Sequence, residues 1–263
     1  MASFYNRFPA SLLGLMLWGW AAPAYGQEPA GFAAREFRNA HGHRLQYRIF
    51  TPENYDPRVR YPLVLWLHDI VGVGNDNRKQ IEGSNEAGAG LWVAPETQSK
   101  YPAFVLAPQC PYGWLWVNLL RRTPSKRLLS VLELIDQLES EYSIDPERLY
   151  VAGQSMGGFA TWALLAYRPD QFAAAVPVSG GGKTSKAKLF AHVPVWAFHG
   201  RLDPLVPVHE SRRMISAMRR AGGQPRFSEV PLQWHGIRFW KVVFQEPGLA
   251  DWVFTQRRAA RSD

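Results

Sequence analysis

Residues 149–158 read Leu-Tyr-Val-Ala-Gly-Gln-Ser-Met-Gly-Gly, and of all stretches in the chain this one is the most informative about its fold. The apolar run 149–152 is typical of a buried strand, and the pattern over 156–167 (MGGFATWALLAY) is that of a helix. Between them, residues 153–157 match the pattern Gly-x-Ser-x-Gly. A strand that turns this sharply into a helix needs glycines beside its serine, because side chains there would collide with neighbouring backbone. The stretch therefore predicts a tight strand–turn–helix unit with Ser155 at its tip.

Short apolar runs alternate with longer helical patterns along the rest of the chain. Residues 63–67 (LVLWL) are continuously apolar, as in strands that are buried on both faces of a sheet. A helix is predicted over 124–142, with Thr123 as its cap and Pro124 in its first turn. This alternation predicts an α/β fold with a mostly parallel sheet and helices on both faces. The other expected strands are 45–50, 104–107, 173–178, 195–198 and 226–232, and the other expected helices are 209–221 and 249–257.

The N-terminal residues have the pattern of an export signal. Arg7 is followed by an apolar segment over 11–22 that is too short to span a bilayer, and Ala24-Tyr25-Gly26 offers small residues for cleavage. We therefore predict that residues 1–26 are a signal peptide and that the protein is secreted or periplasmic, without stable membrane insertion after cleavage. An uncleaved anchor is the alternative. Because no repeat, linker or change of composition follows, residues 27–263 are expected to form a single α/β domain.

Composition excludes several classes of protein and site. The chain has 263 residues, of which 46% are hydrophobic and 20% charged, so it is not a disordered or low-complexity chain. Cys110 is its only cysteine, which excludes an internal disulfide and a cysteine-based zinc site. No histidine pair has ligand spacing with a carboxylate, so we expect neither a metal nor another cofactor. The net charge of +8 is interpreted as a solvated basic face, with no nucleic-acid partner, because no basic run is interleaved with aromatic residues.

A serine hydroxyl is a weak nucleophile and needs a histidine base, which an acid holds in the right tautomer. Asp203 follows an expected strand at its C-terminal end, on the sheet edge where Ser155 is expected. His235 follows the expected strand 226–232. The order Ser155, Asp203, His235 along the chain is one in which an α/β fold places a catalytic serine, acid and histidine. The alternatives are a helix-capping Ser155, a turn-forming Asp203 before Pro204, and a surface histidine at position 235.

Two other histidines are interpreted as structural. His68 ends a buried strand before Ser155, which would reverse the expected order of base and nucleophile. His199 stands four residues before Asp203 and is expected to orient that loop.

Several ordered motifs together carry a resemblance to a known family. They are Tyr61-Pro62-Leu63-Val64, Ala107-Pro108-Gln109-Cys110-Pro111, Ile144-Asp145-Pro146-Glu147-Arg148-Leu149-Tyr150, residues 153–158, and Phe198-His199-Gly200 with Asp203. Over residues 61–256 the chain resembles α/β-hydrolases of the secreted carboxylesterase type. That group includes polyhydroxybutyrate depolymerase-like and feruloyl esterase-like enzymes and predicted peptidases related to prolyl oligopeptidase. The resemblance implies Ser155 as nucleophile, Asp203 as acid and His235 as base.

The chain departs from this family where an oxyanion would be stabilised. Relatives usually have His-Gly where this chain has His68-Asp69, and the resemblance places the oxyanion hole at the backbone N–H groups of Ile70 and Met156. A carboxylate that faced the oxyanion at about 4 Å would repel it by about 4 kcal/mol at an effective dielectric constant near 20. Alternatively, Asp69 turns toward Arg78, Lys79 or solvent.

A second departure is Trp234, which stands before His235 where relatives tend to have glycine. It is expected to narrow the pocket or to hold the imidazole at an unusual angle.

The predicted function is that of a serine carboxylesterase that cleaves small or extended soluble esters through an acyl-enzyme. One alternative is a non-catalytic exported relative that acts as a binding protein, with Asp69 as the lesion, and another is a peptidase on the same triad. The sequence does not assign the acyl group or the alcohol group of the ester. Four tryptophans could line an aromatic cleft or fill the core, namely Trp92, Trp114, Trp116 and Trp234.

Overall fold

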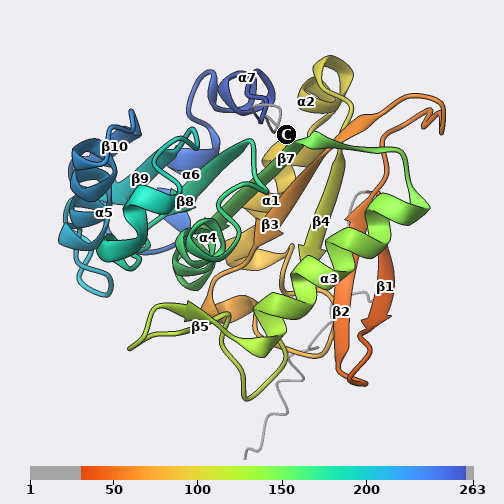
Figure 1. Ribbon diagram of the computed structural model, residues 1–263, viewed down its shortest axis with the longest axis horizontal. Helices are drawn as coiled ribbons and strands as arrows, with labels where there is room; N and C mark the ends of the chain where they lie inside the picture. The colour runs from red at the N-terminus through yellow and green to blue at the C-terminus, as the bar shows by residue number, and fades with distance from the viewer. Residues whose placement is uncertain (1–30, 259–263) are drawn as a thin grey trace, which may run out of the picture.

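An eight-stranded sheet runs through the computed structural model, which describes residues 31–258 (Figure 1). Its strands lie in the order β1-β2-β4-β3-β7-β8-β9-β10. The neighbours from β4 to β10 pair in parallel, whereas β1 and β2 pair antiparallel at one edge. The predicted mostly parallel sheet is therefore confirmed. The strands are β1 (Phe32–Arg38), β2 (Arg44–Phe50), β3 (Tyr61–Leu67), β4 (Phe104–Pro108), β7 (Ile144–Gln154), β8 (Ala174–Val178), β9 (Trp196–Gly200) and β10 (Arg226–Val230).

Helices cover both faces of this sheet. The side chains of β3 alternate, so that Leu63 and Leu65 pack into one core and Val64 and Trp66 into a second. The first core is closed by α3 (Lys126–Glu141), α4 (Met156–Tyr167) and α5 (His209–Arg220). The second is closed by α1 (Glu86–Val93), α6 (Ile237–Phe244) and α7 (Leu249–Phe254). The remaining elements are α2 (Pro95–Lys100), the 3-10 turns η1 (Ile70–Gly72), η2 (Gly83–Asn85) and η3 (Thr184–Leu189), and the hairpin of β5 (Val117–Asn118) and β6 (Thr123–Pro124).

The predicted N-terminus of the helix over 124–142 was wrong by two residues. The helix begins at Lys126, and its cap is Ser125, whose Oγ accepts a hydrogen bond from the Leu128 N–H at 3.3 Å. Thr123 and Pro124 instead pair with β5. Pairing with β5 holds them in extended conformation, which excludes them from the first helical turn.

The last predicted helix and strand are shorter than expected. Helix α7 ends at Phe254, and the chain then runs back along the sheet, where the Arg258 N–H donates to the Glu147 carbonyl at 2.9 Å. Strand β10 ends at Val230, because Leu232 takes a positive φ of 56° that turns the chain out of extended geometry.

The C-terminal ends of the parallel strands gather the segments of interest at one edge of the sheet. The loop with η1 follows β3, Ser155 follows β7, Asp203 follows β9 and His235 follows β10. Between residues 31 and 258, no helix is both long and apolar enough to span a bilayer. The predicted signal peptide, residues 1–26, lies outside the described residues.

Candidate active site

Ser155 stands at a strained turn between β7 and α4. Its φ of 52° and ψ of −116° lie outside the regions that L-residues ordinarily occupy. A Cβ at Gly157 would lie 1.9 Å from the carbonyl oxygen of Leu67, and one at Gly153 would lie 2.5 Å from the Gly157 carbonyl oxygen. The two glycines thus let α4 begin directly against the end of β3. This close approach is the physical reason for the sequence pattern around the serine.

Three side chains from different loops meet at this turn. Ser155 Oγ lies 2.8 Å from His235 Nε2, and His235 Nδ1 lies 2.6 Å from Asp203 Oδ2. Because a carboxylate only accepts hydrogen bonds, Nδ1 carries the proton that it donates to Asp203. Nε2 is then the acceptor for the serine hydroxyl. The arrangement can remove a proton from Ser155 and hold the resulting imidazolium against a negative charge.

The environment of Asp203 keeps its carboxylate ionised. Burial by itself raises the pKa of Asp203, but hydrogen bonds from His199, His235 and the Val206 N–H lower it well below the ordinary value for an aspartate. Oδ1 accepts from the N–H groups of Leu205 at 3.0 Å and Val206 at 2.8 Å. The charge is therefore held in place by the loop that follows β9.

His199 lies beside Asp203, as the sequence predicted for a histidine that orients this loop. Its Nε2 is 2.8 Å from the Val206 carbonyl oxygen and 3.5 Å from Asp203 Oδ2. Its Nδ1 is 2.7 Å from Ser211 Oγ on α5. These contacts tie the Asp203 loop to α5.

The imidazole of His235 packs on α6. Its ring centroid is 5.0 Å from that of Trp240, with the planes at 81°. The preceding Trp234 is 64% exposed, so its side chain lies on the surface. His235 reaches both Ser155 and Asp203 at ordinary hydrogen-bond distances. The expectation that Trp234 narrows the pocket or holds the imidazole at an unusual angle stays a prediction.

The carboxylate of Asp69 points into the protein. It caps η1, where Oδ1 accepts from the N–H groups of Val71 at 3.0 Å and Gly72 at 3.3 Å. Asn85 Nδ2 donates to Oδ1 at 3.1 Å, and Gln154 Nε2 donates to Oδ2 at 3.0 Å. Four N–H donors therefore surround the charge, and Asp69 is only 4% exposed.

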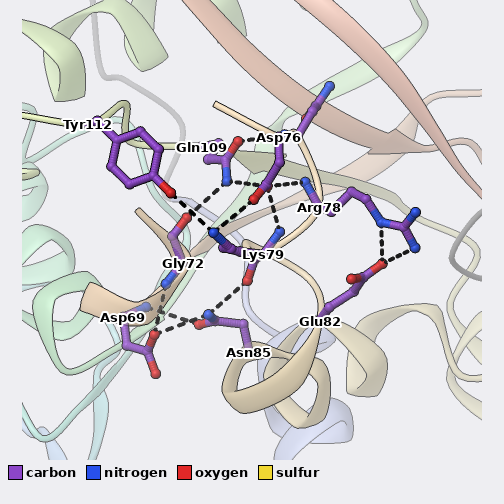
Figure 2. A network of polar contacts seen from close by, with 10 residues as sticks. Asp69, Gly72, Asp76, Arg78, Lys79, Glu82, Asn85, Gln109 and Tyr112 are labelled. Carbon is purple, nitrogen blue, oxygen red and sulfur yellow. Dashed lines mark hydrogen bonds and ion pairs between the residues drawn. The ribbon is translucent and has the colours of Figure 1, made fainter. Parts of the chain in front are cut away.

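The partners that the sequence suggested for Asp69 were wrong. Arg78 pairs with Glu82 at 2.8 Å, and Lys79 pairs with Asp76 at 3.1 Å. Figure 2 shows both pairs on the loop above Asp69, with Asn85 between them and the carboxylate. Asp69 thus turns to amides because the cations of this loop have carboxylates of their own.

Several backbone N–H groups at the starts of η1 and α4 have no acceptor among the described residues. They include the N–H of Ile70, the first residue of η1, and the N–H of Met156, the residue after Ser155 and the first of α4. They follow β3 and β7, which are adjacent strands that pair up to Leu67 and Gly153. Free N–H groups at the beginning of a helical turn can stabilise a negative oxygen.

His68 is buried and structural, in line with its interpretation from the sequence. The Cys110 N–H donates to its Nε2 at 2.9 Å, so its Nδ1–H donates to the Asp69 carbonyl at 2.6 Å. Burial lowers the pKa of His68 to about 4, which keeps the ring neutral. Its neutral ring braces the start of the η1 loop.

The four tryptophans divide between the core and the surface. Trp92 and Trp116 are fully buried and fill the core, whereas Trp114 and Trp234 are exposed. Other exposed apolar residues accompany these two on the loops after β3, β4, β9 and β10 and in the turn between β5 and β6, namely Ile70, Val71, Tyr112, Leu119, Leu120, Leu202, Leu205 and Leu232. A hollow of about 620 Å³ opens beside His235 and is lined by residues 232–239 and Val242.

The sequence interpretation missed Asn85 and Gln154, which hold Asp69. Gln154 falls on a variable position of the Gly-x-Ser-x-Gly pattern, and nothing local marks Asn85. In the part of the chain that the structure describes, no group of three His, Cys, Asp or Glu side chains is placed to hold a metal ion.

Comparisons with known proteins agree with this architecture. Residues 110–186 match the model of the prolyl oligopeptidase family. A solved structure of a thermostable esterase superimposes with a TM-score of 0.83 at 36% identity, over 87% of this chain and 64% of that one.

Two curated relatives bear the names of an esterase/xylanase and of a depolymerase. A bifunctional acetylxylan esterase/xylanase of Neocallimastix patriciarum is 28% identical over 72% of this chain and 26% of its own length. A poly(3-hydroxyalkanoate) depolymerase C of Paucimonas lemoignei is 45% identical over 53 residues, which are 20% of this chain and 13% of the depolymerase. The chain thus spans about a quarter or less of these two curated relatives.

Proposed function

The chain belongs to the α/β-hydrolase superfamily, and we propose that it is a serine esterase that cleaves carboxylic esters through an acyl-enzyme. Ser155 is the nucleophile, His235 the general base and acid, and Asp203 the acid of the triad. One observation carries the proposal, namely the continuous contact from Ser155 Oγ through His235 to Asp203, at 2.8 and 2.6 Å.

The reaction proceeds in two half-reactions. Ser155 Oγ attacks the ester carbonyl carbon while its proton moves to His235 Nε2, and Asp203 stabilises the imidazolium. The N–H groups of Ile70 and Met156 donate to the negative oxygen of the tetrahedral intermediate. His235 then protonates the departing alcohol, which leaves the acyl group on Ser155. A water molecule, deprotonated by His235, repeats the attack and releases the acid.

The surroundings of the triad favour esters with an apolar portion. Exposed apolar side chains lie on loops that follow strands of this sheet, and the hollow beside His235 is bordered by Leu232, Trp234 and Ile237. When an apolar ligand covers such a surface and removes it from water, the free energy of binding becomes more favourable. We therefore propose small or extended esters with an apolar acyl or alcohol group as substrates.

The two other functions considered have less support. A binding protein was considered because an Asp69 carboxylate that faced the oxyanion would repel it and inactivate the site. This carboxylate is instead held by four N–H donors. A peptidase on the same triad is in keeping with the family match over residues 110–186. The relatives whose names include the word esterase favour the esterase.

Export to the periplasm or beyond the cell is part of the proposal and rests on residues 1–26. Sequencing of the N-terminus of protein recovered from the exported fraction tests it. A start at Gln27 is expected, and a start at Met1 in a membrane fraction would favour the anchor.

The enzymatic proposal is tested with a panel of p-nitrophenyl esters and matched p-nitroanilides, with Ser155→Ala as control. We expect turnover of the esters by the wild type, with a burst of one p-nitrophenol per chain where deacylation is slow. Turnover of the anilides in preference to the esters would favour the peptidase. Equal ester turnover by Ser155→Ala would contradict the mechanism.

A further inference from the structure

A hydrogen bond joins Asp69 and Gln154, which lie just before the N–H groups of Ile70 and Met156 in the chain. Gln154 stands two residues before Met156, and Asp69 stands directly before Ile70. We propose that the hydrogen bond between Asp69 and Gln154 is a positioning contact that fixes the two donors of the oxyanion hole relative to one another. This inference rests on the proposed esterase function.

The Asp69 carboxylate decides which amide of its loop is free. The residues after it offer three consecutive N–H groups, at Ile70, Val71 and Gly72. Oδ1 accepts from Val71 and Gly72, which leaves the N–H of Ile70 as the only one of the three without an acceptor in the described structure. An aspartate here therefore caps the turn and selects its donor, which a glycine could not do.

Gln154 extends the connection between β3 and β7 beyond their backbone pairing. The register of these strands ends at Leu67 and Gly153, so their ladder does not reach Ile70 or Met156. Past that point, Gln154 Nε2 donates to Asp69 Oδ2 at 3.0 Å and also to the Ser84 carbonyl at 2.8 Å. The Gln154 side chain, directly before Ser155 in the chain, thus links the end of β7 to the loop after β3.

Asn85 completes the arrangement from a third segment. The Asp69 N–H donates to Asn85 Oδ1 at 3.0 Å, and Asn85 Nδ2 returns a bond to Asp69 Oδ1 at 3.1 Å. Gln154 and Asn85 are fully buried. Buried hydrogen bonds to a charged group are strong, and losing one partner leaves the others unsatisfied. The geometry of Asp69 is therefore set jointly by η2 and β7.

The catalytic effect of such a contact falls on the transition state. Oxyanion donors act on charge that develops during the reaction, so displacing one lowers kcat and leaves KM nearly unchanged. Removal of a whole donor costs roughly 100- to 1,000-fold in kcat, and a displaced donor costs less. We expect about a 10- to 100-fold loss when the Asp69–Gln154 bond is removed.

The test is a double-mutant cycle with Asp69→Asn and Gln154→Met, assayed with a short-chain p-nitrophenyl ester. Methionine keeps the length of Gln154 but cannot donate, and the amide introduced by Asp69→Asn would face the amide of Gln154. Each single variant is expected to lose about 10- to 100-fold in kcat with less than about a threefold change in KM, and the double variant to lose little more than the worse single variant. The affinity for a trifluoromethyl ketone inhibitor should fall in parallel with kcat.

Two further variants sharpen the result. Glu82→Gln disturbs the same loop at its surface pair with Arg78 and is expected to keep kcat within about twofold. Asp69→Gly, which restores the residue common in relatives, is expected to lower kcat as well, because it removes the cap.

The inference is overturned if the wild type turns over esters but Gln154→Met keeps its kcat, if the losses of the two variants multiply, or if Asp69→Gly is faster than the wild type. Should Asp69→Asn fail to fold, the kinetics of Gln154→Met alone test the inference. A loss confined to kcat supports it, and a kcat equal to that of the wild type overturns it. Absence of wild-type turnover would instead contradict the proposed function, so the two failures are distinguishable.

Discussion

Asp203 Oδ2 and His235 Nδ1 lie 2.6 Å apart, although 32 residues separate them in the chain. The contact exists because β9 and β10 pair in parallel, which brings the loops after their C-terminal ends to one edge of the sheet. It fixes the proton of His235 on Nδ1 and leaves Nε2 to accept from Ser155.

Asp203→Asn is expected to lower kcat by about 10,000-fold, since an asparagine amide favours the wrong tautomer of the histidine. The measurement is steady-state hydrolysis of a p-nitrophenyl ester, with circular dichroism to establish that the variant is folded. A folded variant within tenfold of the wild type would contradict the role of Asp203.

The same carboxylate predicts how stability depends on pH. The pKa of Asp203 is lowered in the folded state by its hydrogen bonds with His199, His235 and Val206, against the opposing effect of burial. Its contribution to the free energy of unfolding is therefore complete above the unfolded pKa of about 3.9 and is lost as the pH falls below that value.

Urea unfolding at pH 5, 4 and 3 tests this for the wild type and Asp203→Asn. The wild type should lose more free energy of unfolding between pH 4 and pH 3 than the variant does. Parallel losses would show that Asp203 is not a stabilising charge.

Gly157→Ala is expected to destabilise the fold by about 2 kcal/mol or more, because its methyl group would lie 1.9 Å from the Leu67 carbonyl oxygen. Gly90→Ala in α1 is the matched control. A Cβ there meets nothing within 4 Å, so alanine should stabilise the helix by about 0.5 to 1 kcal/mol. Thermal unfolding of both variants checks this, and a melting temperature of Gly157→Ala at or above that of the wild type would contradict the packing account.

Trp234→Ala is expected to raise KM for naphthyl esters about three- to tenfold and to leave KM for p-nitrophenyl acetate within twofold. Trp234 is exposed beside His235, so its loss removes apolar contact surface without opening the core. Steady-state kinetics with both esters and a thermal melt are the measurements. An equal change of KM for both substrates would argue against a role of this tryptophan in recognition.

The sequence predicted the unit around Ser155 well because its constraints are local. Helix α4 has the predicted bounds, and a tight turn with flanking glycines leaves few alternatives. The alternation of strands and helices likewise predicted that the loops carrying Ser155 and Asp203 lie at the same edge of a parallel sheet. The catalytic roles of Ser155, Asp203, His235, Ile70 and Met156 stay predictions.

The sequence did not predict the elements and contacts that depend on residues far away in the chain. Helix α1 contains Gly88, whose absent side chain makes room for Trp66, and this glycine weakens the helical pattern. Strand β1 is an edge strand with mostly exposed side chains, so it lacks the apolar run of a central strand. The partners of Asp69 come from Asn85 and Gln154, which are 16 and 85 residues away. Only the folded arrangement brings these amides to the carboxylate.

The most direct test of an activated Ser155 is labelling with a fluorophosphonate probe followed by mass spectrometry of the modified peptide. The wild type is expected to carry one label, on Ser155, and Ser155→Ala is expected to carry none. Folded wild-type protein that stays unlabelled, or that is labelled equally after Ser155→Ala, would contradict the account.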